Sequence, residues 1–124
     1  MAMFEQNVLN NYIKEVKTKY KGIVQDLNLE ALSDQDGDYI NLILIEIKRN
    51  RRNQGYGSVI LSGIVRLADE YNVRITLWPT DVFGANMKRL RTFYRRHGFV
   101  LNKTSKEEGG MIYRPKKKFR RVVT

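Results

Sequence analysis

The chain has 124 residues, of which 42% are hydrophobic, and this length predicts one folded domain with its own apolar core. It contains no cysteine and one histidine, His97, which excludes disulfides, a cysteine nucleophile and a metal site built from several histidines. Its formal net charge of +10 predicts an anionic partner, and both nucleic acid and a phosphorylated cofactor fit that description.

The first part of the chain is predicted to form a helix and a β-hairpin. Apolar residues recur at helical spacing over residues 5–20, and Gly22 ends that helix. Residues 24–32 fit a strand, and the polar cluster 33–38 fits a turn. Residues 39–47 are nearly all apolar and rich in β-branched side chains, which predicts a central strand buried on both faces.

The second part of the chain is predicted to alternate between helices and strands. Together with the hairpin, this order predicts a mixed α/β sheet with helices on its faces. The predicted elements are a long helix that follows Gly55-Tyr56-Gly57-Ser58 and ends near Tyr71, a strand over 73–78 that Pro79 stops, a loop over 80–85, a helix that includes Met87 and ends before Gly98, and short strands over 99–102 and 111–114.

The basic, glycine-containing segment between the buried strand and the long helix is the most informative part of the sequence. It reads Arg52-Asn53-Gln54-Gly55-Tyr56-Gly57-Ser58. Amides in the first turn of a helix lack intrahelical partners and lie at the positive end of the helix dipole, so they favour a phosphate group. The third glycine of the dinucleotide fingerprint and the Gly-Lys-Ser/Thr of the P-loop are both absent. A Gly-x-Gly before a helix is also found in ordinary loops, and that alternative stays open.

The segment from Arg52 to Gly57 resembles the [Q/R]-x-x-G-x-[G/A] pyrophosphate motif of the GNAT acetyltransferases. The order and spacing of elements over residues 39–114 are similar to that family, including a helix that carries Tyr94 and closes in Gly98-Phe99. The chain looks most like the short GNAT proteins common in phage genomes. The resemblance implies a GNAT fold, with a mixed central sheet, helices on both faces, a splayed central strand pair and a shortened N-terminal part.

The resemblance also implies a cofactor and a reaction. Acetyl-CoA would bind with its pantetheine arm along backbone groups of Glu46, Ile47 and Lys48, and an amine on a protein or a small molecule would attack the thioester directly. Asn86 stands where the family often has a polar residue that contacts the cofactor, one position further from Tyr94 than is commonest. The residues expected to bind the cofactor are Ile47, Lys48, Arg52, Gln54, Gly55, Tyr56, Gly57, Ser58 and Asn86.

Three titratable residues are considered for proton transfer. Tyr94 matches the general-acid tyrosine of the family, and its phenol, with a reference pKa of about 10, is protonated at neutral pH; the alternative is that it packs in the core beside Leu90. Glu46 is the only acid in an apolar strand and is expected to accept a proton from the amine, unless it pairs with an arginine or is simply exposed at the strand's end. His97, next to a helix end, is expected to be a capping or surface residue.

Basic residues gather in three clusters, at 48–52, 88–96 and 116–121. Coenzyme A carries roughly four negative charges, so part of the first two clusters is expected to serve it. We take residues 1–115 as the acetyltransferase domain and 116–124 as a basic tail, which would bind nucleic acid or an acidic protein or simply be solvated. The alternative function is therefore a non-catalytic GNAT-fold protein that binds such a partner through its basic surface.

Two further expectations concern the surroundings of the protein. One helix precedes the hairpin, whereas fuller family members have a strand and two helices there, so the acceptor site is expected to be open to a macromolecule or completed by a homodimer partner. No apolar segment approaches the roughly 20 residues of a membrane span, and no signal-peptide pattern is present. We therefore expect no membrane partner and a cytoplasmic location, in the host cell if a phage encodes the protein.

Overall fold

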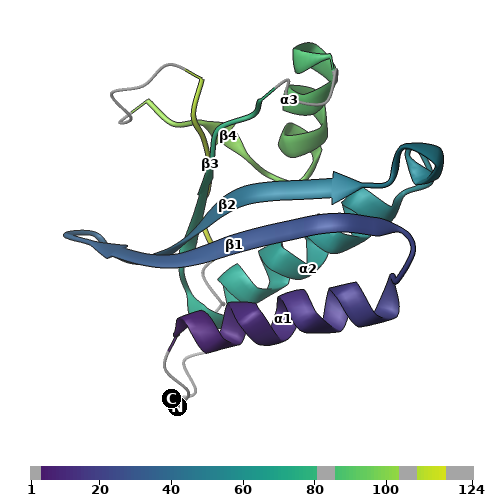
Figure 1. Ribbon diagram of the computed structural model, residues 1–124. Coiled ribbons are helices and arrows are strands. Elements are labelled where there is room, and N and C mark those ends of the chain that lie inside the picture. The colour runs from purple at the N-terminus through teal and green to yellow at the C-terminus, as the bar shows by residue number, and fades with distance from the viewer. Residues whose placement is uncertain (1–3, 81–85, 104–108, 117–124) are drawn as a thin grey trace, which may run out of the picture.

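The structure is a computed structural model that describes residues 4–80, 86–103 and 109–116. No helix within these ranges combines the length and the apolar character that crossing a bilayer requires. The elements in chain order are α1 (Gln6–Lys19), β1 (Val24–Asp34), β2 (Gly37–Ile47), the 3-10 helix η1 (Arg49–Arg51), α2 (Tyr56–Tyr71), β3 (Arg74–Leu77), α3 (Met87–Arg96), β4 (Val100–Leu101) and β5 (Met111–Tyr113) (Figure 1).

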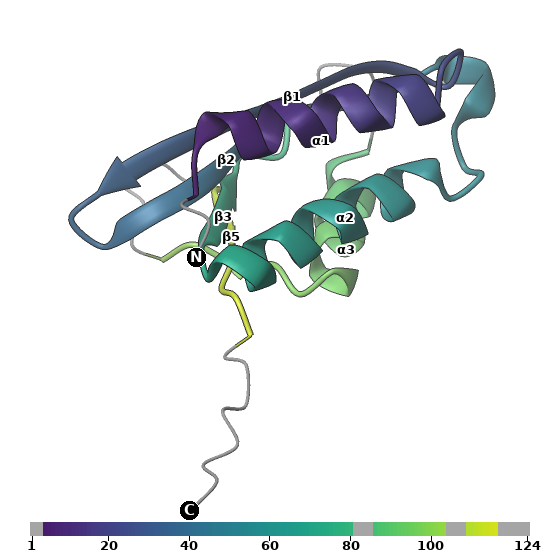
Figure 2. The same ribbon diagram turned by 90° about the horizontal axis from the view of Figure 1, so that it is seen from below.

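The strands form one mixed sheet in the order β1-β2-β3-β5-β4. β2 and β3 run parallel, whereas the other neighbouring strands pair antiparallel. Helices α1 and α2 lie on one side of the β1–β2 hairpin and α3 lies on the other, as Figure 1 and Figure 2 show from two directions. The predicted mixed α/β fold with helices on both faces is therefore confirmed.

The β1–β2 hairpin is tighter than the sequence analysis predicted. Asp34 pairs with Gly37, so only Gln35 and Asp36 form the turn, and strands occupy both ends of the predicted turn 33–38. The Asp34 carboxylate accepts a hydrogen bond from the Asp36 amide at 2.8 Å. Gly37 has a φ of 106°, which glycine adopts without strain, and this lets the chain reverse within two residues.

Only Ile40 and Leu42 of β2 are buried, which corrects the prediction of a strand covered on both faces. β2 pairs with β3 from Tyr39 to Leu42, and residues 43–47 have no partner in β3. Ile40 and Leu42 are buried, whereas Ile43 is 45% exposed. The two central strands therefore separate after Leu42, as the resemblance to GNAT proteins implied.

The apolar core lies between the sheet and the helices α1 and α2. Its most deeply buried side chains include Leu9 of α1, Leu29 of β1, Ile40 of β2, Ile64 of α2 and Ile75 of β3. Full burial of such a side chain contributes about 1.5–3 kcal/mol to folding. The helix faces that the apolar periodicity predicted are thus the faces that the two helices bury.

The segment that follows β5 is fastened to α2. The Asp69 carboxylate accepts hydrogen bonds from the Tyr113 hydroxyl at 2.7 Å and from the Lys116 amide at 3.0 Å. Burial, together with this bond, raises the pKa of Tyr113 to about 12, so the phenol remains a donor at all ordinary pH values. Lys116, the first residue of the proposed tail, therefore contacts the domain, and the rest of that tail lies outside the described residues.

Gly63 allows α1 and α2 to approach closely. Tyr12 of α1 lies over it and donates a hydrogen bond to the Ile60 carbonyl at 2.7 Å. A Cβ at position 63 would collide with the Tyr12 hydroxyl and lie 2.8 Å from the Tyr12 Cζ atom. The small residue in the middle of α2 is therefore required by packing, although glycine is a poor helix former.

We expect Gly63→Ala to lower the free energy of unfolding by about 1–3 kcal/mol, because the overpacking outweighs the better helix propensity of alanine. Urea unfolding measures this change. Ser62→Ala, at the exposed neighbouring position, is the control and should leave the stability equal or slightly higher. If both alanine variants stabilised the protein equally, the proposed packing of Tyr12 over Gly63 would be wrong.

Candidate functional site

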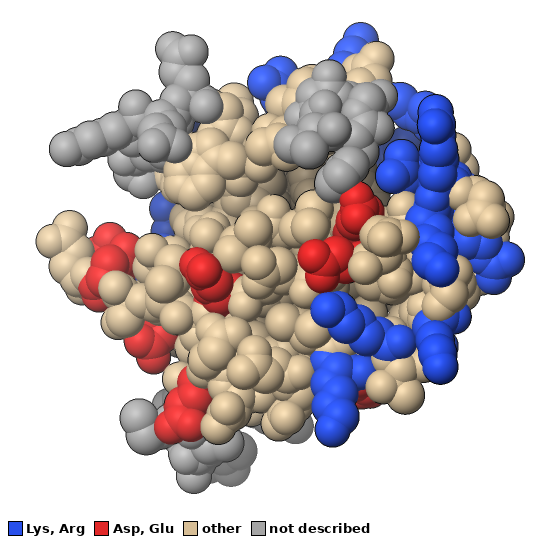
Figure 3. Space-filling model, viewed as in Figure 1, with Lys and Arg blue, Asp and Glu red and all other residues tan. Residues whose placement is uncertain are grey.

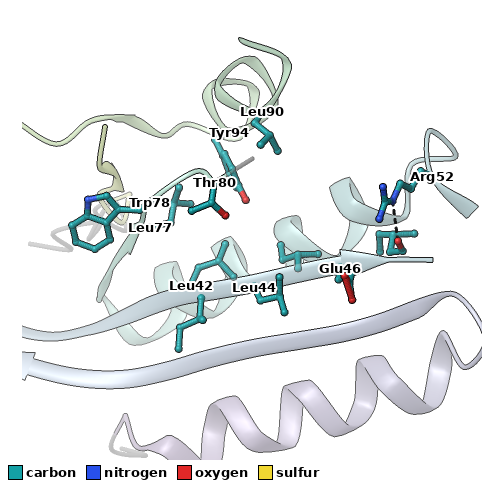
Figure 4. A pocket seen from close by; sticks show the side chains of 12 residues that line it. Leu42, Leu44, Glu46, Arg52, Leu77, Trp78, Thr80, Leu90 and Tyr94 are labelled. Carbon is teal, nitrogen blue, oxygen red and sulfur yellow. Dashed lines mark hydrogen bonds between the residues drawn. The ribbon is translucent and has the colours of Figure 1, made fainter. Parts of the chain in front are cut away.

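A cleft opens where β2 and β3 separate (Figure 4). β2 forms one wall of this cleft, and α3 forms the opposite wall. Apolar side chains with a few polar groups among them make up its lining, as in ligand sites generally. Residues from β2, from the end of β3, from the loop before α2 and from α3 contribute, among them Glu46, Ile47, Arg52, Leu77, Trp78 and Tyr94.

Backbone groups of β2 face this cleft. The Lys48 amide donates to the Ile23 carbonyl at 2.8 Å, on the β1 side of the strand. Hydrogen-bonding groups of successive strand residues alternate between the two edges of a strand, so those of Ile47 and Ile45 point to the opposite edge, where β3 has ended. The Ile47 carbonyl accepts a hydrogen bond from Arg52 Nε at 3.0 Å on that edge. β2 thus presents main-chain donors and acceptors to an extended ligand.

The backbone of Lys48, which the resemblance placed along the pantetheine arm, already has hydrogen-bond partners within the protein. Its N–H is bonded to Ile23, and its carbonyl accepts a hydrogen bond from the Arg51 amide at 2.8 Å, so both groups already have partners. Ile45 is the residue that offers its backbone beside Ile47, and the sequence analysis missed it. An apolar run predicts a strand, but it does not indicate which residues turn their amides toward a gap.

The N-terminus of α2 follows the loop beside the cleft and has no side-chain cap. α2 begins at Tyr56, and its N-cap residue Gly55 has a left-handed φ of 87°. The Val59 amide bonds to the Gly55 carbonyl at 3.1 Å, so the amides of Tyr56, Gly57 and Ser58 come before the first intrahelical bond. No acidic residue lies in this turn to compete with an anion. The arrangement suits a phosphate or diphosphate group.

Aromatic and cationic contacts hold the loop that leads to α2. The rings of Tyr56 and Tyr20 lie 5.8 Å apart, and the Arg51 guanidinium lies 5.8 Å from the Tyr56 ring centroid. Gln54 is exposed in the bend just before Gly55. Within the described part of the chain, Arg51 Nε is buried without a hydrogen-bond partner, and a bound anion would satisfy such a donor.

α3 packs on the first turn of α2 through His97. Its Nε2 atom lies 2.9 Å from Ser58 Oγ, and its ring meets the Phe93 ring at 5.2 Å. Burial lowers the pKa of His97 below its usual 6.5, so the ring is neutral at pH 7. His97 is the C-cap residue of α3, as expected. It is half-buried because its ring packs between α3 and the first turn of α2.

Tyr94 reaches from α3 toward β2 (Figure 4) and lines the cleft. Burial raises the pKa of its hydroxyl above the usual value of about 10, so the phenol holds its proton at neutral pH. The ring also contacts Phe93 and Phe99, with centroids 5.3 and 5.6 Å away. Tyr94 is therefore both anchored by core side chains and present at the cleft, so the two alternatives raised by the sequence coexist.

Glu46 lines the same cleft as Tyr94, from the side of β2. It is half-buried, and within the described ranges it forms no ion pair, so the arginine partner considered from the sequence is not found. Its cross-strand neighbour on β1 is Asp26, whose carboxylate lies 3.3 Å from Lys17 Nζ. The cleft therefore brings together the two residues that the sequence analysis proposed for proton transfer.

Asn86 is placed differently from the expectation of a cofactor contact. Its side-chain oxygen accepts hydrogen bonds from the amides of Lys88 and Arg89, at 2.8 and 3.4 Å, and so caps α3. It is exposed and does not line the cleft. Trp78, which does line it, was not proposed from the sequence, although its place at the end of β3 before a proline was a usable signal.

Charge is unevenly distributed around the cleft. Figure 3 shows Lys and Arg gathered along one edge of the molecule, over η1 and α3, and Asp and Glu over the face of the hairpin. The elements at the basic edge carry Lys88, Arg89, Arg91, Arg95 and Arg96 on α3 and Arg49 and Arg51 on η1. An anion would therefore approach from the side of α3 and the α2 N-terminus.

No protein-family model matches the sequence, and no curated protein is similar to it in sequence. Solved structures share its fold. The anti-CRISPR protein AcrVA5 matches with a TM-score of 0.54 at 19% identity, over 70% of this chain and 88% of that one. AtaTR bound with acetyl-CoA matches with a TM-score of 0.53 at 15% identity, over 71% of this chain and 55% of that one. Ard1 from Thermoplasma volcanium matches with a TM-score of 0.50 at 14% identity, over 94% of this chain and 84% of that one. The protein shares the fold of these structures, which is the GNAT fold.

Proposed function

We propose that the protein is an acetyl-CoA-dependent N-acetyltransferase that transfers the acetyl group to an amine acceptor by direct attack on the thioester. One observation carries this proposal: the lining of the cleft between β2 and β3 includes Arg52, in the short loop that leads to the uncapped first turn of α2. A ligand with an amide-containing arm and a diphosphate would fill both. The similarity in fold to AtaTR bound with acetyl-CoA supports this choice of cofactor.

The residues that would hold the cofactor follow from the free groups of the site. The amides of Tyr56, Gly57 and Ser58 would bind the diphosphate, with Arg52 and the exposed Gln54 at the entrance. Gly55 sets the backbone turn that presents these amides. The backbone groups of Ile45 and the amide of Ile47, whose carbonyl already accepts from Arg52 Nε, would bind the pantetheine arm, and the bound cofactor would supply an activated acetyl thioester.

Proton transfer is assigned to the two titratable side chains of the cleft. Tyr94 would hold a proton at its hydroxyl for the departing thiolate, which its raised pKa favours. Glu46 would take a proton from the acceptor ammonium, directly or through a water molecule, because only the neutral amine attacks. The acceptor is an amine on a protein or a small molecule, and a second copy of the chain would complete the acceptor site if the protein dimerises.

The finer expectations about origin belong to the same proposal. The resemblance to short phage-encoded GNAT proteins supports a cytoplasmic location, in the host cell if a phage carries the gene. Residues 1–115 would form the catalytic domain and 116–124 the basic tail. Calorimetric titration with acetyl-CoA, followed by a thiol-release assay against a panel of amines, tests the central proposal.

Gly57→Glu is expected to weaken acetyl-CoA binding by at least about tenfold, because a carboxylate in the first turn of α2 would repel the diphosphate. The fold should tolerate the change, since a Cβ at this position would lie 3.6 Å from Phe93 and an acid suits a helix N-terminus. Calorimetry measures the affinity, and Gly57→Ala is the matched control that adds a Cβ without a charge. Equal affinity of Gly57→Glu and the native protein would contradict the assignment of this turn.

Tyr94→Phe is expected to lower kcat about 100-fold while the Kd for acetyl-CoA stays within about twofold, since the hydroxyl donates a proton but does not anchor the cofactor. Tyr71→Phe, which removes a hydroxyl from the far end of α2, is the control. Because the pKa of Tyr94 is raised above 10, the native rate should rise with pH as the amine loses its proton, without a falling limb below about pH 10. An unchanged kcat in Tyr94→Phe would remove the tyrosine from the mechanism.

A second candidate function is non-catalytic binding of nucleic acid or an acidic protein. The observation that favours it is the basic edge over η1 and α3, and the sequence adds a separate basic tail after β5. Coenzyme A carries roughly four negative charges, and the basic edge offers more positive charge than that. This excess is also compatible with an acetyltransferase that docks on an anionic partner.

Binding of a duplex DNA or RNA probe separates the two functions. A nucleic-acid binder would show an affinity that falls steeply with salt, survives Gly57→Glu and is lost when residues 117–124 are deleted. The acetyltransferase is expected to show the reverse pattern in acetyl-CoA binding. Tail-dependent probe binding without any acetyl-CoA affinity would favour the second function over the first.

A further inference from the structure

The face of the β1–β2 hairpin that points away from α1 and α2 carries apolar side chains exposed to solvent. Leu27 and Leu29 of β1 are buried on the core side, so the intervening residues and Leu32 lie on the opposite face. Leu32 is 39% exposed, and Ile43 of β2 is 45% exposed. Trp78, at the end of β3 and on the rim of the cleft, is 40% exposed.

Carboxylates accompany these apolar side chains. Glu30 is exposed on the same face of β1, and Asp26 lies directly across from Glu46 on the paired strand. Like charges in opposite cross-strand positions are destabilising. Lys17 lies 3.3 Å from Asp26, but Glu46 has no ion partner among the described residues. A cation at the mouth of the cleft would therefore supply the ion partner that Glu46 lacks among the described residues.

We propose that this face, made of Glu30, Leu32, Ile43, Glu46 and Trp78, is a docking surface for a basic polypeptide segment that bears the acceptor lysine. This inference rests on the proposed function, and it names the acceptor class. The two entrances of the cleft would then carry opposite charges. Basic residues lie over η1 and α3 at one entrance, and acidic residues lie over the hairpin at the other (Figure 3).

The size and chemistry of the face favour a polypeptide over a small amine. From Asp26, across from Glu46, to Leu32 the strand extends roughly 20 Å at about 3.3 Å per residue, which an extended segment of about six residues would span. Exposed apolar side chains between the acids suit a segment that alternates basic and apolar residues. The net charge of +10 repels a basic segment at long range. Binding of the segment would therefore depend on close contacts with this face alone.

The test uses two fluorescein-labelled peptides that carry one lysine and blocked termini, the first with arginine and leucine flanks and the second with glutamate in place of arginine. Fluorescence anisotropy measures their binding with acetyl-CoA omitted, and thiol release measures turnover with acetyl-CoA present. We expect the native protein to bind and acetylate the basic peptide at least about fivefold better than the acidic one.

Glu30→Lys is expected to remove most of this preference, because it reverses a charge at the centre of the face. Glu70→Lys is the matched control, since it makes the same change in net charge at an exposed position on α2, on the other side of the sheet. The control should keep the native preference. Circular dichroism and urea unfolding of both variants establish that each remains folded.

The outcomes separate this inference from the proposed function. Turnover of simple amines by the native protein, with no preference between the peptides or with equal effects of the two charge reversals, would overturn the docking surface and leave the acetyltransferase standing. Selective binding of the basic peptide that Glu30→Lys abolishes would support the surface even if no amine were turned over, and the proposed function would then fail alone. A polyamine turned over better than any peptide would also overturn the inference.

Discussion

The separation of β2 from β3 is the constraint on which the rest of the site depends. The strands are paired from Tyr39 to Leu42 on one side and from Arg74 to Leu77 on the other, and β2 then continues alone to Ile47. Pro79 follows the end of β3 and has no amide to extend the ladder. Main-chain groups left open in this way are costly inside a protein unless they find partners. The break that leaves the sheet incomplete is thus also what creates a binding cleft.

The two sides of the cleft differ in electrostatic character. Basic side chains of η1 and α3 lie on the side of the α2 N-terminus, and the carboxylates of Asp26, Glu30 and Glu46 lie on the hairpin. The net charge of +10 is a total over the whole chain and does not show that basic and acidic side chains lie on different sides of the cleft. Long-range attraction would bring an anionic cofactor to one entrance, while close contacts would select a cation at the other. The two co-substrates of the proposed reaction would then not compete for one path.

Much of the fold could be predicted because its elements have strong periodic patterns. The three helices were found from apolar spacing and from turn residues such as Gly22 and Gly98, and the glycines at 55 and 57 marked the N-terminus of α2. Tyr94 and Glu46, proposed from a family pattern and from an isolated charge, line one cleft.

Several details of the site depend on information that a sequence pattern does not contain. Whether Lys48 or Ile45 turns its amide to the gap depends on the register of β2 against β1, which two register shifts alter. Asn86 is a residue type that serves equally well as a ligand contact and as a helix cap, and here it caps α3. The burial of His97 depends on how closely two helices meet, and the exposure of Ile43 depends on where β3 stops.

The hydrogen bond between Ser58 and His97 has a mechanical consequence for the molecule. It connects the last turn of α3 to the first turn of α2. Tyr94 belongs to the same last turn of α3, and its carbonyl accepts a hydrogen bond from the His97 amide at 3.0 Å. In the proposed reaction, a shift of the first turn of α2 when the cofactor binds would therefore act on the turn of α3 that carries the Tyr94 phenol. Binding of the cofactor diphosphate and placement of the proposed proton donor would then be linked through one side-chain hydrogen bond.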